Sequence, residues 1–183
     1  MTRRLFIFDA PDVFLPATVG EPGQRTFFLH ARKGRAVVNV ALEKAQVSAL
    51  ADRMTDLLIA VDERQPSPSS TPETEPPTAA LTPDGPMVEA FRVGAMALSW
   101  DGEAERVVIE AQPEDASGEY VEAADSDEDG PDLMRVRIGI GQAEAFVRRA
   151  QALVTAGRPP CPFCGQPLEA TGHFCLRSNG QLN

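Results

Sequence analysis

Four potential metal ligands lie close together near the end of the chain: Cys161, Cys164, His173 and Cys175. The first two belong to a Cys-Pro-Phe-Cys-Gly stretch, whose tight turn lets both thiolates reach one ion. His173 and Cys175 are two residues apart, so on an extended strand both point to the same side. Four Cys and His ligands complete a tetrahedron and leave no position for water or substrate. The sequence therefore predicts a closed, structural, zinc-ribbon-like Zn²⁺ site in residues 158–183.

Two other kinds of chemistry use similar residues. A Cys-x-x-Cys pair such as Cys161 and Cys164 also forms glutaredoxin-type redox centres, where the first thiol is activated at a helix N-terminus. Those centres follow the first strand of a βαβ unit, whereas this pair follows the last predicted helix. Gly165 and Pro167 also disfavour a helix that starts there. A catalytic zinc would need three ligands and an open position, and both alternatives remain open beside the structural site.

Four further residues are candidates for ligand or partner binding. Arg25 ends the Gly-rich loop that starts at Thr18, and this loop could hold an anion through its N–H groups and the guanidinium. A Pro-Gly turn between two strands explains the loop equally simply. His30 lies in a predicted strand without a nucleophile signature nearby, so packing competes with a catalytic role. Arg177 and Asn179 follow the last zinc ligand, and we interpret them as a contact surface ordered by the metal.

Charge favours a protein partner over nucleic acid. The chain has a net charge of −10, and eight acidic residues with no basic residue lie between Glu114 and Asp129. Such a chain repels phosphate backbones unless it segregates a strongly basic face. The densest basic group in the first hundred residues comprises Arg25, Arg32, Lys33 and Arg35. It could dock an acidic partner, and it could equally be the solvated tip of a hairpin.

The elements that must position these residues form one pattern twice: three strands followed by a helix. The first half has predicted strands at 5–8, 26–31 and 36–41 and a helix over 47–61. The second half has predicted strands at 91–100, 106–111 and 133–140 and a helix over 143–154. An offset of one hundred positions superimposes the two halves. Such a match is expected from a duplication, and it is equally expected by chance, because any strand followed by an amphipathic helix has this pattern. The predicted fold is α+β, with an antiparallel sheet from two β-β-β-α units and both helices on one face.

The predicted organisation has four parts. The first unit covers 1–63, and a disordered linker with seven prolines covers 64–86. The second unit covers 87–157 and contains an acidic flexible insertion at 113–131, and the zinc-binding tail covers 158–183. No apolar run is long enough for a membrane span or a secretory signal, so we expect a cytoplasmic protein without a membrane partner.

Several stretches resemble an uncharacterised actinobacterial family of about this length, known only as a domain of unknown function. They are Val19-Gly-Glu-Pro-Gly-Gln-Arg-Thr-Phe-Phe-Leu, Leu42-Glu-Lys-Ala-Gln-Val, Cys161-Pro-x-Cys-Gly-x-Pro-Leu and Gly172-His-x-Cys-x-Arg-x-Asn-Gly. The resemblance covers nearly the whole chain apart from the two flexible segments. Fifteen Arg against two Lys are typical of a GC-rich genome, which agrees with that lineage. The resemblance implies no established activity.

Two functions from different classes follow. The first is a non-enzymatic adaptor or regulatory module with a structural Cys₃His zinc site and a protein partner. The alternative is an enzyme, or a small-molecule or anion-binding protein, whose cleft between the two units uses Arg25 and His30.

Overall fold

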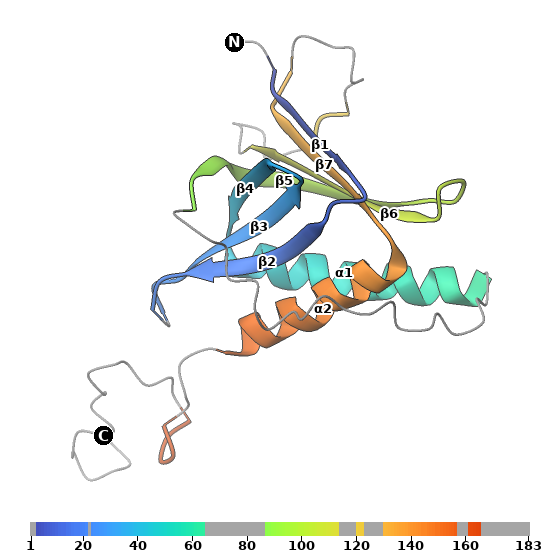
Figure 1. The fold of residues 1–183 in the computed structure, drawn as a ribbon. Coiled ribbons are helices and arrows are strands. Elements are labelled where there is room, and N and C mark those ends of the chain that lie inside the picture. Colours follow the sequence, from blue (N-terminus) through green and yellow to red (C-terminus); the bar gives the residue numbers. More distant parts are fainter. Residues whose placement is uncertain are drawn as a thin grey trace.

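The computed structural model describes residues 3–21, 23–64, 87–113, 120–122, 130–156 and 161–165. In this part of the chain seven strands form one sheet in the order β1-β7-β6-β5-β4-β3-β2. Two helices pack against each other on one side of the sheet (Figure 1). The strands are β1 (Leu5–Asp9), β2 (Val13–Val19), β3 (Thr26–Lys33), β4 (Ala36–Leu42), β5 (Glu89–Asp101), β6 (Arg106–Pro113) and β7 (Leu133–Ile138). The helices are α1 (Lys44–Arg64) and α2 (Ile140–Thr155), and neither is long and apolar enough to cross a membrane.

The α+β class is confirmed, but the prediction of a purely antiparallel sheet is wrong. β1 pairs with β7 in parallel, and β4 pairs with β5 in parallel, whereas the other four pairs are antiparallel. A parallel pair needs a crossover rather than a hairpin turn, and α1 lies in the connection between β4 and β5. The β4–β5 pair is therefore parallel because the second unit joins the first through a helix.

β2 is a strand without a predicted counterpart. Pro16 interrupts its pattern, and proline inside a run argues against a strand because it cannot donate to the ladder. Here Pro16 is tolerated because β2 is at the edge of the sheet and pairs only with β3. The Pro16 carbonyl accepts a hydrogen bond from Nε of Arg149 on α2, at 2.9 Å. Pro16 has no backbone N–H to offer at this edge, and α2 packs beside it through Arg149.

The sheet curls until its two edges approach each other. β1 and β2 are at opposite ends of the strand order, yet only residues 10–12 separate them along the chain. The Ala10 N–H donates to the Arg137 carbonyl at 3.0 Å, and the Gly34 N–H donates to the Asp12 carboxylate at 2.7 Å. This corner therefore ties the β3–β4 turn and β7 to the same short connection.

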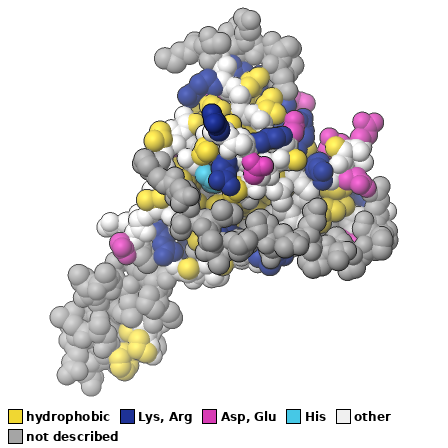
Figure 2. All heavy atoms as spheres, viewed as in Figure 1, with side chains coloured by type: hydrophobic (Ala, Val, Ile, Leu, Met, Phe, Trp, Pro, Cys, Tyr) yellow, Lys and Arg dark blue, Asp and Glu magenta, His cyan; other side chains and the backbone are white. Residues whose placement is uncertain are grey.

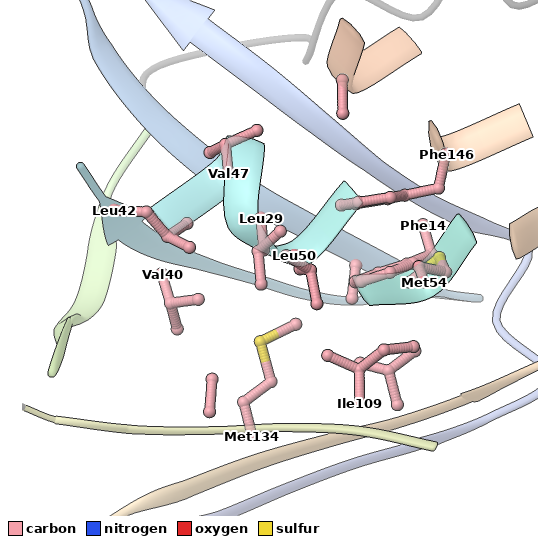
Figure 3. Close-up of a cluster of buried hydrophobic side chains, with 14 of the residues drawn as sticks. Phe14, Leu29, Val40, Leu42, Val47, Leu50, Met54, Ile109, Met134 and Phe146 are labelled. Atoms are coloured by element: carbon pink, nitrogen blue, oxygen red, sulfur yellow. The ribbon is translucent and has the colours of Figure 1, made fainter. Parts of the chain in front are cut away.

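One hydrophobic core lies between the sheet and the helices, and both units contribute to it. The ring of Phe14 on β2 stacks on the ring of Phe146 on α2, with centroids 5.1 Å apart (Figure 3). Met54 of α1 lies in the same cluster as Ile109 of β6 and Met134 of β7 (Figure 3). Because each half buries its apolar face against the other, neither half has a core of its own.

The two units match at an offset of 96 positions rather than one hundred. Both consist of three consecutive strands and a helix, β2-β3-β4-α1 and β5-β6-β7-α2. With 96 as the offset, the end of β4 at Leu42 falls on the end of β7 at Ile138. Four buried residues of α1 then fall on the four buried residues of α2, namely Val47, Leu50, Ala51 and Met54 on Ala143, Phe146, Val147 and Ala150. The offset of one hundred is wrong by about one helical turn, and the corrected match is what a repeated unit predicts.

Candidate functional site

The described part of the predicted zinc site is a closed turn. Residues 162–164 form the turn, and the Gly165 N–H donates to the Cys161 carbonyl at 2.8 Å. Gly165 has φ +75°, a backbone conformation that residues with a Cβ rarely adopt. Cys161 is buried and Cys164 is half-buried. The turn lies beyond the C-terminal end of α2 (Figure 1).

The remaining predicted ligands, His173 and Cys175, lie outside the described residues. Arg177 and Asn179 lie outside them as well. Among the residues that the structure does describe, no group of three or more Cys, His, Asp or Glu side chains converges on a possible metal position. The structure therefore describes one half of the predicted ligand set.

Arg25 caps a helix. Its Nη1 donates to the carbonyl of Ala156 at 2.8 Å, and Ala156 is the C-cap of α2. The last carbonyls of a helix lack partners within the helix, and the macrodipole makes that end negative. The preceding loop turns at Gly20, with φ +103°, and the Gln24 N–H donates to the Glu21 carbonyl at 2.9 Å. The Arg25 guanidinium, which the sequence suggested could bind an anion, thus binds the negative C-terminal end of α2.

His30 forms a buried polar pair. Its Nδ1 lies 2.7 Å from Oδ1 of Asn39, its neighbour on β4. Asn39 Nδ2 donates to the Val88 carbonyl at 3.4 Å, which leaves Oδ1 facing the imidazole. An amide oxygen only accepts, so His30 Nδ1 carries the proton and donates it. Both side chains are buried, and the pair links β3, β4 and the start of β5.

The structure does not bring Arg25 and His30 together. Leu29 packs in the core with the helices, so the next residue along β3, His30, lies on the opposite face of the sheet. Arg25 instead reaches the end of α2. We refer below to the sheet face away from the helices, which carries His30, Glu110 and Arg135, as the outer face.

A polar cluster on the outer face was not singled out from the sequence. Glu110 on β6 accepts hydrogen bonds from Arg135 Nε at 2.5 Å and from the Tyr120 hydroxyl at 2.6 Å. Two residues further along β6, Gln112 is 2% exposed. Its Nε2 donates to the Val121 carbonyl at 2.6 Å, and its Oε1 accepts from the Val121 N–H at 2.8 Å. Two residues of the predicted acidic insertion are therefore bound along β6.

Burial disfavours the charged phenolate of Tyr120, and the hydrogen bond to the Glu110 carboxylate disfavours it further. Together they raise the pKa of Tyr120 to about 12. The signal in the sequence was the alternation of Glu110 and Gln112 with the apolar residues Ile109 and Ala111, which places two polar side chains on one face of a strand. The partner of that face could not be predicted, because Tyr120 follows a segment without a strand pattern.

A shallow groove of about 330 Å³ runs between α1 and β5. It is lined mainly by small or apolar residues, including Ala49, Met96 and Leu98, with Gln46 and Arg53 from the helix. Both ends of the Gln46 amide have partners, since its Nε2 donates to the Val93 carbonyl at 3.0 Å and its Oε1 accepts from the Glu43 N–H, just before α1, at 2.8 Å. The groove contains neither Arg25 nor His30.

The chain matches one family model over residues 6–175, from β1 to the last predicted zinc ligand. No curated protein and no solved structure matches the chain. Since the matched region covers most of the sequence, the chain belongs to the family described as protein of unknown function, DUF3090.

Proposed function

We propose that this protein is a zinc-binding adaptor or regulatory module whose metal is structural. The observation that carries the proposal is the closed turn at Cys161–Gly165, with its 2.8 Å hydrogen bond and a glycine at φ +75°. Cys161, Cys164, His173 and Cys175 would hold the ion. A further support is that the family match extends to Cys175 and so includes all four residues.

The ion would order the tail rather than the body of the protein. Structural zinc in small peptides contributes about 10–16 kcal/mol to folding at neutral pH. The sheet and helices bury an extensive core of their own, so they do not need that contribution. A chelator is therefore expected to disorder the tail while the far-UV circular dichroism and thermal midpoint of the body change little.

Native mass spectrometry of protein purified without added metal tests the proposal. We expect one zinc ion per chain, and we expect Cys161→Ser and Cys164→Ser to lose it. Phe163→Ala is the matched control, because this side chain lies in the same turn but is 50% exposed. Freshly reduced wild-type protein without zinc would overturn the proposal.

Cobalt substitution separates a structural site from a catalytic one. Four protein ligands give the absorption bands of tetrahedral thiolate-bound Co²⁺, and no position remains for an added ligand. We expect these bands to be unchanged by added imidazole or azide. A shift on adding either ligand would reveal an open position and would favour catalysis at the metal.

The adaptor role is favoured because the two residues that the enzyme alternative required have structural partners. Arg25 is engaged with the end of α2 and His30 with Asn39, so the proposed cleft loses both of its functional side chains. Arg177 and Asn179 would form a contact surface beside the metal. Unchanged partner binding in Arg177→Ala and Asn179→Ala would remove that part of the proposal. We also infer a cytoplasmic protein of actinobacterial origin, from the family resemblance and the arginine-rich composition.

A further inference from the structure

The turn between β3 and β4 carries two exposed arginines. Arg32 and Arg35 flank this turn and are exposed. Neither side chain makes a hydrogen bond or an ion pair in the part of the chain that the structure describes. Lys and Arg side chains lie over the strands on the face that Figure 2 shows, with Asp and Glu side chains among them. Within the described residues, the two guanidinium groups are therefore open to an external partner.

Other arginines of the sheet already have acidic partners. The ion pairs are Arg4–Asp132 at 2.5 Å, Arg135–Glu110 at 2.5 Å and Arg137–Asp9 at 2.6 Å. In a chain with a net charge of −10, carboxylates are plentiful. Within the described residues no carboxylate forms an ion pair with Arg32 or Arg35, although the Asp12 carboxylate accepts a hydrogen bond from the Gly34 N–H of the same turn.

Hydrogen bonds to Asp9 and Asp12 hold the turn in place. The Lys33 ammonium donates to the Asp9 carbonyl, and the Gly34 N–H donates to the Asp12 carboxylate at 2.7 Å. Gly34 has φ +58°, which suits a two-residue hairpin turn. Because the turn is already ordered, a partner that binds it pays little to order its backbone.

An exposed apolar side chain lies beside Arg32. Val37 is directly opposite Arg32 in the β3–β4 ladder and is 48% exposed. We name Arg32, Arg35 and Val37 the hairpin patch.

We propose that the hairpin patch docks an extended acidic segment of a partner protein that carries carboxylates and an apolar residue on the same side. Guanidinium groups bind carboxylates through two parallel hydrogen bonds, and Val37 would cover the apolar residue. A phosphate backbone fits less well, since two unpaired cations on an acidic chain give little of the charge that nucleic acid binding requires. The inference rests on the adaptor part of the proposed function and names the class of partner.

Fluorescence anisotropy of the full-length, zinc-loaded protein tests the proposal with a fluorescein-labelled peptide of repeated Glu-Ser-Val-Ser, which places Glu and Val on one side of an extended chain. We expect binding that weakens with salt, and a loss of about tenfold or more in the Arg32→Glu/Arg35→Glu variant. Val37→Ser should weaken binding by a smaller factor. The matched control is Arg53→Glu/Arg64→Glu, which makes the same change of charge at exposed positions of α1 and should bind like the wild type.

Several outcomes would overturn the proposal. No binding, or equal losses in the two double variants, would exclude a specific patch. Tighter binding of single-stranded oligothymidylate through Arg32 and Arg35 would assign the patch to nucleic acid. Self-association in sedimentation velocity that the Arg32→Glu/Arg35→Glu variant abolishes, without peptide binding, would assign it to a second copy.

The zinc measurement separates this proposal from the one above. A Cys161→Ser/Cys164→Ser variant should still bind the peptide, because the hairpin patch is built on β3 and β4 of the sheet. Peptide binding by a wild-type chain that contains no zinc would refute only the metal site. A zinc-loaded chain that does not bind the peptide would refute only the hairpin patch.

Discussion

At the scale of single residues, Tyr120 can be measured directly because it is the only tyrosine of the chain. The near-ultraviolet absorbance of tyrosinate should titrate with a pKa of about 12 in the folded protein. Glu110→Gln should lower this pKa, because it removes the carboxylate that disfavours phenolate, although the effect of burial remains. A wild-type titration at the ordinary value of 10.0 would contradict the contact between Tyr120 and Glu110.

The raised pKa of Tyr120 also predicts how stability depends on pH. Below the unfolded-state value of 10.0 the phenol is protonated in both states, and its contribution is fully present. As the pH rises toward about 12, the unfolded state loses its proton first, so the folded state loses this contribution. Urea denaturation across this window should show a smaller decline for Glu110→Gln than for the wild type.

Single residues also show what could and could not be predicted from the sequence. Arg25 and His30 were identified as unusual, but their roles depend on partners elsewhere in the fold. The guanidinium of Arg25 binds a carbonyl 131 positions away, and His30 binds a residue on the next strand. Residue type and local spacing carry no information about such contacts. The cysteine turn was predictable because its closing hydrogen bond spans only Cys161 to Gly165.

At the scale of elements, Arg25 links the β2–β3 loop to α2, which gives a testable prediction. Arg25→Ala should lower the free energy of unfolding by about 1 kcal/mol, since it removes a charged hydrogen bond from a helix C-terminus. Arg25→Lys should retain part of this contribution, because its charge still faces the helix end. Urea denaturation measures the effect, with Arg53→Ala on the exposed face of α1 as the control. Equal losses for Arg25→Ala and Arg53→Ala would contradict the capping role.

Elements with a regular apolar pattern were predicted well, and those defined by their surroundings were not. Both helices and six of the strands follow from periodicity and turn residues. β2 is a strand although it contains Pro16, because the edge of the sheet and Arg149 accommodate that residue. The parallel pairing of β1 with β7 could not be predicted, since it depends on how the sheet curls.

At the scale of the whole molecule, the shared core predicts that the two units unfold together. Phe146 is 1% exposed and stacks on Phe14 of the other unit. Phe146→Ala should therefore lower the free energy of unfolding by about 3–5 kcal/mol. Fluorescence of Trp100, the only tryptophan, reports on β5, whereas far-UV circular dichroism reports on both helices. Coincident transitions by both probes are expected, and two separate transitions would mean that the halves fold independently.

The pairing of β1 with β7 has a consequence for synthesis of the chain. Leu5 on β1 pairs with Leu133 on β7, 128 residues later. At about 5–20 residues per second, the ribosome needs roughly 6–25 seconds to make the chain between them. During that time Phe6 and Phe8 of the first strand have no β7 beside them. The apolar strand β1 therefore stays unpaired in the nascent chain until β7 has been synthesised. During this interval β1 is the segment to which a chaperone is expected to bind.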